Sequence, residues 1–159
     1  MEYWDLYNSK RQRINKLHKR GDDMLKGEYH IVVNVWIKNN ENRFIVTQRH
    51  PNKPFPLKWE CSGGSVVAGE DSFTGALREV EEEIGIKLNP ENGKLIFTRQ
   101  RENDFKDTYL FKEDIKIEDT ILQETEVVKI KLVTYDELKE MVETEEIAEP
   151  IWEDVKLLG

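Results

Sequence analysis

Hydrophobic and polar positions alternate in short runs through the first third of the chain, a pattern typical of β-strands. The segment His30–Ile37 (HIVVNVWI) is β-branched and aromatic, and Arg43–Gln48 (RFIVTQ) follows an Asn-rich turn, so the two predict a hairpin. The looser alternation of Tyr3–Lys19 predicts a short strand pair at the edge of the fold. Pro51–Pro56 (PNKPFP) predicts a loop, because its prolines cannot donate to a β-ladder. Trp59–Ser62 predicts a short strand before the Gly63-Gly64 break.

The clearest predicted helix is Asp71–Ile84. At 100° per residue, its apolar side chains fall within roughly 60° of one another and form one stripe; they are Phe73, Leu77, Val80 and Ile84. Gly85 would end this helix as a left-handed cap.

Further elements follow in the second half of the chain. Strands are expected at Lys94–Arg99, Asp107–Phe111 and Glu126–Val133. A helix is expected at Tyr135–Glu143, with Thr134 as N-cap and Glu137 at the capping-box position, and a last helix at Ile147–Leu158, beginning near Pro150. Strands dominate the first part of the chain and helices lie between the later ones, an order that predicts an α+β sandwich. No linker or repeat divides the chain, so residues 1–159 are expected to form one domain, with residues 1–20 as a strand-pair extension.

The predicted helix also has an acidic face. Relative to Glu79, Glu82 lies at about −60° and Glu83 at about +40°, so the three carboxylates share one face, which the helical wheel places opposite the apolar stripe. Like charges at this spacing repel, and a divalent cation would relieve the repulsion, since carboxylate oxygens are ligands that Mg²⁺ and Mn²⁺ prefer. Arg78, four residues before Glu82, can hold a carboxylate in a ligating rotamer. An EVEEE run alone would more simply be a solvated helix face.

The residues around this run decide between the two interpretations. Gly64 is followed after five residues by Glu70, and after seven more by Arg78-Glu79-Val80-Glu81-Glu82-Glu83-Ile84-Gly85-Ile86. This spacing resembles the signature of the Nudix family at every specified position. The resemblance implies a sandwich of mixed and antiparallel β-sheet between helices, in which the segment Gly64–Ile86 forms a loop-helix-loop.

The resemblance also implies an activity and roles for these residues. Nudix enzymes cut a diphosphate bond in a nucleoside diphosphate linked to another group X, using Mg²⁺ or Mn²⁺. By position, Glu79, Glu82 and Glu83 look like metal ligands, Glu70 like a loop acid that binds or organises metal, and Arg78 like the orienting arginine. The glycines Gly64 and Gly85 would supply backbone conformations that a side chain forbids. The catalytic set would be Glu79, Glu82 and Arg78 with a general base.

The base and the substrate contacts lie outside the signature. A general base could be a signature glutamate or an acid of a later loop, and Glu124 and Glu126 are the candidates there, of which we favour Glu126. Arg49, Lys53 and Lys58 flank the Pro-rich loop and are expected to face the substrate's phosphates; surface bases without a role are the competing interpretation.

Composition narrows the partners. The net charge of −8 argues against binding to a nucleic acid polymer, which relies on clustered Lys and Arg. The residues up to Arg13 contain no apolar run, so neither a signal peptide nor a membrane span is expected. The single cysteine, Cys61, excludes an intrachain disulfide and suits a reducing compartment. We therefore expect a cytoplasmic protein, monomer or homodimer, that acts on a small-molecule diphosphate.

Two other functions are compatible with parts of the sequence. The run of Gln48, Arg49, Lys53, Pro54 and Trp59, with the N-terminal strand pair, also resembles the isopentenyl diphosphate isomerase branch. That branch uses a cysteine about five residues after this tryptophan, where this chain has Gly64, and Cys61 comes too early. The other alternative is a non-catalytic nucleotide-binding module, but such modules generally lose signature glutamates that are intact here.

Overall fold

The computed structural model describes residues 1–159 and contains two β-sheets with three α-helices and three 3₁₀ turns. The strands are β1 (Tyr3–Tyr7), β2 (Arg13–Lys19), β3 (His30–Lys38), β4 (Phe44–Arg49), β5 (Trp59–Glu60), β6 (Ser62–Ser65), β7 (Gly93–Gln100), β8 (Asp104–Lys112) and β9 (Val127–Val133). The helices are α1 (Ser72–Ile84), α2 (Tyr135–Glu143) and α3 (Trp152–Val155), and the turns are η1 (Pro90–Asn92), η2 (Ile117–Asp119) and η3 (Glu149–Ile151). No helix is long and apolar enough to cross a membrane.

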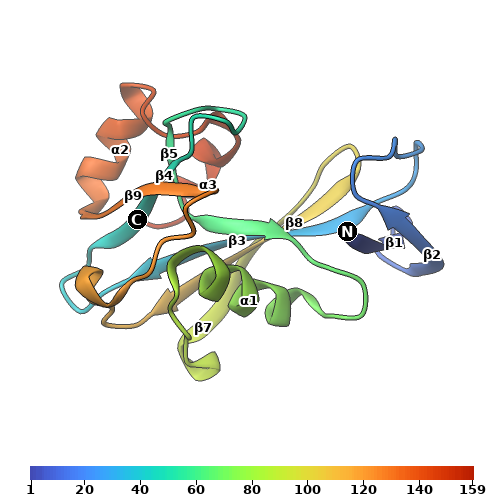
Figure 1. Ribbon diagram of the computed structural model, residues 1–159, viewed down its shortest axis with the longest axis horizontal. Coiled ribbons are helices and arrows are strands. Elements are labelled where there is room, and N and C mark those ends of the chain that lie inside the picture. The colour runs from blue at the N-terminus through green and yellow to red at the C-terminus, as the bar shows by residue number, and fades with distance from the viewer.

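Strand β3 is the centre of the larger, seven-stranded sheet. It pairs in parallel with β8 along its whole length, from His30↔Asp104 to Lys38↔Lys112, and antiparallel with β6. Its alternate residues enter two different hydrophobic cores, Val33 and Val35 on the side of α1 and Trp36 on the side of α2 and α3. Because both faces of β3 are covered, its sequence is a nearly continuous apolar run. The α+β sandwich with a mixed sheet is thus confirmed (Figure 1).

The predicted hairpin of β3 and β4 is wrong except at its turn. The two strands pair only at Lys38↔Phe44, and β4 then pairs with β9 and β5 instead. The local pattern identified both strands, but it could not show that each pairs more extensively with strands distant in sequence. The divergence matters, because it leaves space between β3 and β4 for side chains of both strands.

The N-terminal strand pair is confirmed, and it forms a separate two-stranded sheet. It lies at one end of the molecule, away from α2 and α3 (Figure 1). Trp4 stacks on His30 of β3 at a centroid distance of 3.8 Å, and Arg11 forms a bidentate ion pair with Asp107 of β8. The carbonyl of Tyr3 accepts from the backbone N–H of Ala68, so the pair also contacts the loop that precedes α1.

The C-terminal helix is much shorter than expected. Of Ile147–Leu158, only Trp152–Val155 is α-helical, after the turn η3. The backbone N–H groups of Leu157 and Leu158 bond to carbonyls three residues earlier, so the chain continues in tight turns. Ile151, Val155 and Leu158 are nevertheless buried. The apolar spacing therefore predicted correctly that these side chains pack, but not the backbone conformation of the segment. Helix α2 has the predicted bounds, and its capping box between Thr134 and Glu137 is confirmed.

Candidate active site

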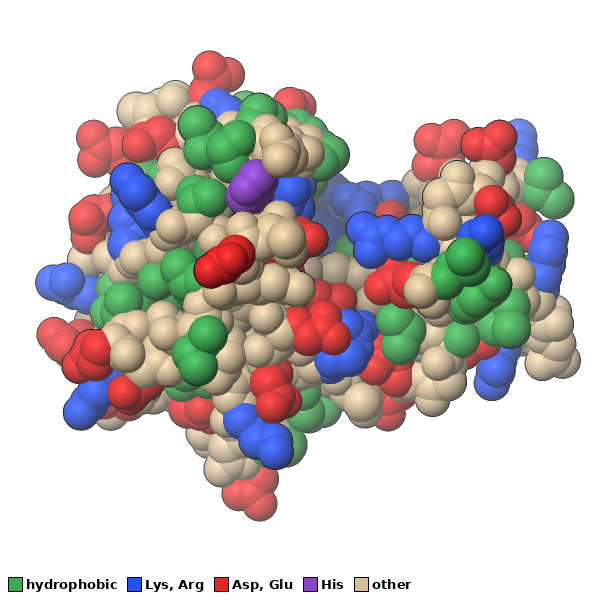
Figure 2. Space-filling model, in the orientation of Figure 1, with side chains coloured by type: hydrophobic (Ala, Val, Ile, Leu, Met, Phe, Trp, Pro, Cys, Tyr) green, Lys and Arg blue, Asp and Glu red, His purple; other side chains and the backbone are tan.

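A cleft of about 630 Å³ lies where α1, β6 and the divergent strands β3 and β4 meet. The N-terminal strand pair closes one side of it with Glu2 and Arg20. Figure 2 shows a hollow between this strand pair and the rest of the molecule, with acidic and basic side chains at its margin. The cleft is therefore built by segments that are far apart in the sequence.

Helix α1 supplies the acidic wall. The Asp71 side chain caps its first turn by accepting from the Thr74 backbone N–H, and Gly85 ends it in the left-handed conformation, as expected. The cleft is lined by Glu79, Glu82 and Glu83. The three acids share one face of α1, as predicted; Glu79 and Glu83 are buried there, whereas the Glu82 side chain is half exposed.

Arg78 ties the acids together. Its Nε and Nη2 donate to the Glu70 carboxylate at 2.6–3.1 Å, and its Nη1 donates to Glu79 and Glu82 at 3.1 Å each. Nη2 also donates to the carbonyl of Ser65 on β6. One guanidinium therefore joins the loop acid, two helix acids and a strand, as the orienting role implied by the family resemblance would require.

Burial of like charges changes the acidity of these groups. Burial raises the pKa of Glu79 to about 7, with nearby Glu82 adding to the effect and Arg78 opposing it. Burial, and then the charges of Glu60 and Glu79, raise the pKa of Glu83. The protein thus holds carboxylates in a place that disfavours their negative charge.

Gly64 has a different role from the one expected. Its φ angle is not positive, so no special backbone conformation is needed there. The constraint is space: a Cβ atom on Gly64 would lie 2.4 Å from Oε1 of Glu79. Because Gly64 has no side chain, the Glu79 carboxylate can occupy its position in the cleft.

The donor set suits a divalent cation. The cleft presents carboxylate oxygens that are buried beside one another, and glycine leaves room for one of them. In this conformation no three acidic, histidine or cysteine side chains converge closely enough to hold an ion, because Arg78 engages Glu79 and Glu82 instead. Binding a cation there would require these ion pairs to rearrange.

The opposite wall carries charges of both signs and includes two of the three predicted phosphate-binding residues. Arg49 and Lys53 line the cleft, where Arg49 pairs with Glu60 at 2.7 Å and Lys53 pairs with Glu126. Lys58 does not line it; its ammonium group donates to the carbonyl of Glu145 in the turn after α2. Of the two candidate bases, Glu126 lines the cleft and Glu124 does not.

Seven cleft residues were not identified from the sequence: Glu2, Arg20, Asn34, Asn52, Glu60, Ser65 and Gln123. Glu2 pairs with Arg20 at 3.1 Å across the N-terminal strand pair. Burial raises the pKa of Glu60, and its neighbour Arg49 opposes the shift. These residues reach the cleft only through tertiary structure, and the one available signal was the alternation that predicted the strand pair.

Cys61 borders the cleft but is buried between β5 and β6. Burial raises the pKa of its thiol well above the ordinary value, so the reactive thiolate is disfavoured. This environment fits a small packing residue and gives no support to cysteine-dependent isomerisation.

Comparisons with known proteins agree with this geometry. The model of the NUDIX domain matches residues 28–152. An uncharacterized Nudix hydrolase of Listeria monocytogenes is 36% identical over 141 residues, which cover 87% of this chain and 83% of the relative.

Solved structures share the fold. The DR0079 protein of Deinococcus radiodurans superposes with a TM-score of 0.79 at 22% identity, covering 98% of both chains. The NUDIX domain of Shewanella oneidensis NrtR, solved with ADP ribose, gives a TM-score of 0.58 at 14% identity over 77% of this chain and 82% of that one. The family model and the 36% identical relative both point to one family, and the intact acidic helix agrees with them. This chain therefore belongs to the Nudix hydrolase family, whose members hydrolyse pyrophosphate bonds.

Proposed function

We propose that this protein uses Mg²⁺ or Mn²⁺ to hydrolyse the diphosphate bond of a nucleoside diphosphate linked to a further group X. The observation that carries the proposal is the cleft itself, in which signature acids on α1 face Arg49 and Lys53 across one space. The acids of α1 suit cations, and Arg49 and Lys53 suit phosphates, so a metal-bound diphosphate is complementary to the two walls. Residues 1–159 would act as one domain.

The metal-binding part of the proposal assigns Glu79, Glu82, Glu83 and Glu70 as carboxylates that hold the cation. A divalent ion held there supplies positive charge that neutralises phosphate oxygens and increases the acidity of water. Arg78 is a positioning residue, since it orients Glu70, Glu79 and Glu82 at once. Its contact with the Ser65 carbonyl fixes that arrangement to the sheet.

The chemical step needs a proton acceptor and phosphate contacts. Water attacks one phosphorus, the bond from that phosphorus to the bridging oxygen breaks, and the leaving phosphate carries the bridging oxygen away. Glu126 accepts the proton of the water, and its ion pair with Lys53 holds it in the cleft. Arg49 and Lys53 contact the phosphates, whereas Lys58 is too engaged with the turn after α2 to be assigned there.

A substrate panel with matched variants tests this proposal. The purified protein is incubated with nucleoside triphosphates, nucleotide sugars, ADP-ribose and isoprenoid diphosphates, with Mg²⁺ or Mn²⁺, and the phosphate-containing products are identified. Glu82→Gln and Glu83→Gln should each lower kcat by about 10²-fold or more. Glu81→Gln is the control, because Glu81 lies on the same helix but is exposed and does not line the cleft.

The outcomes separate the alternatives. Metal-dependent product release that is lost in Glu82→Gln and Glu83→Gln, but retained in Glu81→Gln, supports hydrolysis at this wall. Isomerised isoprenoid diphosphate without hydrolysis would support the isomerase branch. Nucleotide binding by calorimetry without turnover of any compound would replace the proposal with a non-catalytic binding module.

Glu126 has its own test. Glu126→Gln should lower kcat with little change in KM, because the amide cannot accept the proton. Glu124→Gln is the control, since Glu124 lies outside the cleft. Equal effects of the two substitutions would reject Glu126 as the base.

We also propose a cytoplasmic location and a monomeric or homodimeric state. A reducing, cytoplasmic environment fits the single buried cysteine. A monomer or a homodimer is expected, and light scattering at several protein concentrations would distinguish them.

A further inference from the structure

A second, smaller pocket adjoins the cleft. It has a volume of about 180 Å³ and shares Asn34, Arg49, Pro54 and Glu60 with the cleft. We name it the side pocket; besides the shared residues, its lining includes Phe55, Arg101, Lys106 and Ile151. A substrate group next to the diphosphate therefore has this pocket as a neighbour of the cleft.

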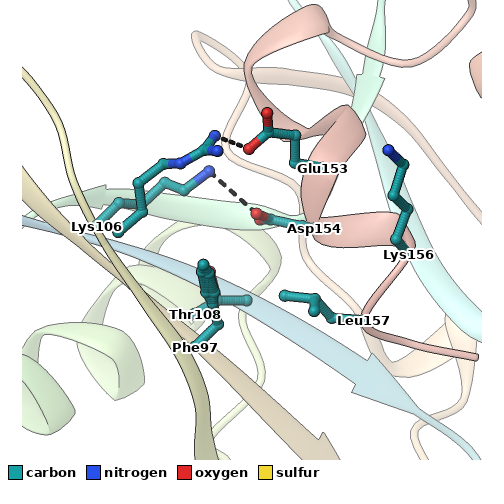
Figure 3. A pocket seen from close by; sticks show the side chains of 8 residues that line it. Phe97, Lys106, Thr108, Glu153, Asp154, Lys156 and Leu157 are labelled. Carbon is teal, nitrogen blue, oxygen red and sulfur yellow. Dashed lines mark hydrogen bonds and ion pairs between the residues drawn. The ribbon is translucent and has the colours of Figure 1, made fainter.

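The floor of the side pocket fixes the orientation of one amide. Asn34 donates through Nδ2 to Asp154 at 2.9 Å, and Asp154 accepts in turn from the ammonium group of Lys106 at 3.0 Å. Figure 3 shows Lys106 extending from β8 toward Asp154 on α3. All three residues are buried, which holds the network in place.

This network determines what Asn34 offers to a ligand. A carboxylate only accepts hydrogen bonds, so the NH₂ group of Asn34 must face Asp154 and its Oδ1 must face away. Oδ1 points toward β6, where it would lie 2.8 Å from a Cβ atom on Gly63. Gly63 lines the cleft and not the side pocket, so this oriented acceptor lies on the cleft side of Asn34.

Two guanidinium groups offer the complementary donors. Arg101 uses Nε and Nη2 for Asp104, at 2.6 and 2.9 Å, which leaves Nη1 without a protein partner. Arg49 uses Nε for the Pro54 carbonyl and Nη1 for Glu60, which leaves Nη2. Asp104 holds Arg101 by a bidentate contact, and Pro54 and Glu60 hold Arg49 by one hydrogen bond each, so the remaining donors have defined directions.

Phe55 adds an aromatic surface. It lies in the Pro-rich loop with a φ of +53°, a conformation that bulky residues rarely adopt, and 41% of it is exposed. Such strain persists where surrounding structure enforces it, often at ligand sites. An exposed ring beside oriented donors is a surface on which a flat heteroaromatic ring can stack.

We propose that the side pocket binds the base of the nucleoside substrate, stacked on Phe55, with a ring acceptor toward Arg101, while Arg49 stays with the phosphates. The inference rests on the proposed function, because it assumes that a nucleoside carries the diphosphate to be cut. Its volume suits a single ring system, since pockets that enclose whole drug-sized ligands are typically about 300 Å³ or larger.

Binding of molecules that cannot be hydrolysed tests this inference separately from activity. AMP, GMP, CMP and UMP contain no diphosphate bond, and ribose 5-phosphate is the probe that lacks a base. By calorimetry, at least one nucleoside monophosphate should bind at least fivefold more tightly than ribose 5-phosphate. Phe55→Ala should weaken that nucleotide about tenfold and leave ribose 5-phosphate unchanged.

Leu57→Ala is the matched control, because Leu57 is an exposed apolar residue of the same loop, also with positive φ, that does not line the side pocket. Arg101→Ala should likewise weaken only the nucleotide. Overturning results are equal binding of ribose 5-phosphate and all four nucleotides, or equal loss in Phe55→Ala and Leu57→Ala. Absence of diphosphate hydrolysis would refute the proposed function instead, while these binding differences would still decide the pocket.

Discussion

Replacing Gly64 by alanine tests whether the position of the Glu79 carboxylate matters. The new methyl group would lie 2.4 Å from Oε1 and 2.5 Å from Cδ of Glu79, whereas nonbonded carbon contacts are ordinarily about 3.5–4.0 Å. The carboxylate must therefore move by about 1 Å, and it would weaken its 3.1 Å hydrogen bond from Arg78. A misplacement of about 1 Å can cost about 10²-fold in rate, so kcat of Gly64→Ala should fall by about that factor.

The assay compares four proteins at saturating metal: wild type, Gly64→Ala, Glu79→Asp and the double variant. Aspartate is one methylene shorter and makes room for the methyl group, so the double variant should lose less activity than the product of the two single losses. Thermal unfolding is measured in parallel, because crowding at this site should cost about 1–3 kcal/mol and leave the fold intact. Activity of Gly64→Ala within threefold of wild type, or strictly multiplicative losses, would refute the steric reasoning.

Three further perturbations address the acids, the strand pair and its docking. Arg78→Lys keeps the charge but loses the fork that reaches Glu70, so Mn²⁺ affinity measured by electron paramagnetic resonance should fall about 10–100-fold; unchanged affinity would contradict a positioning role. Arg20→Ala should raise KM up to about fivefold at constant kcat, and Glu2→Gln should lower KM by freeing Arg20; opposite or equal shifts in steady-state kinetics would reject Arg20 as a substrate contact. Burial lowers the pKa of His30 to about 4, so above pH 6.5 the imidazole is neutral in both the folded and the unfolded state, and as the pH falls from 6.5 toward 4 the unfolded state binds the proton first. The contribution of His30 to the free energy of unfolding should then drop by about 3 kcal/mol across that window. Chemical denaturation of His30→Phe, which keeps a ring against Trp4, should lack that part of the acid sensitivity, and identical pH profiles would disprove it.

Sequence patterns predicted the local elements well. The capping residues of α1 and α2, the left-handed Gly85 and the strand pair all depend on interactions within a few residues, or on hydrophobic alternation. The family signature brought the acids together because they lie on one helix. Burial of Glu79 and Glu83 could not be deduced in the same way, since it depends on β6 and on the wall that contains Arg49 and Lys53.

The rest of the site depends on pairings between distant segments. Parallel contact of β3 with β8, and the departure of β4 toward β9, place Asn34, Arg49 and Glu60 around the same space. No local pattern encodes such pairings, which is why the hairpin prediction was correct only next to its turn. Lys58 illustrates the converse: it is close in sequence to Lys53, but its side chain turns to the carbonyl of Glu145.

The attachment of the N-terminal strand pair has a consequence for the order of folding. Arg11 pairs with Asp107, ninety-six positions later, and Asp5 accepts from the backbone of Gly69 in the loop that carries Glu70. Both buried clusters consist of residues beyond the pair and can form without it, whereas the pair can dock only when β8 and the Gly69 loop are in place. During refolding, the fluorescence of the buried tryptophan should therefore recover before enzymatic activity does, because the wall formed by Glu2 and Arg20 is the last part of the cleft to form.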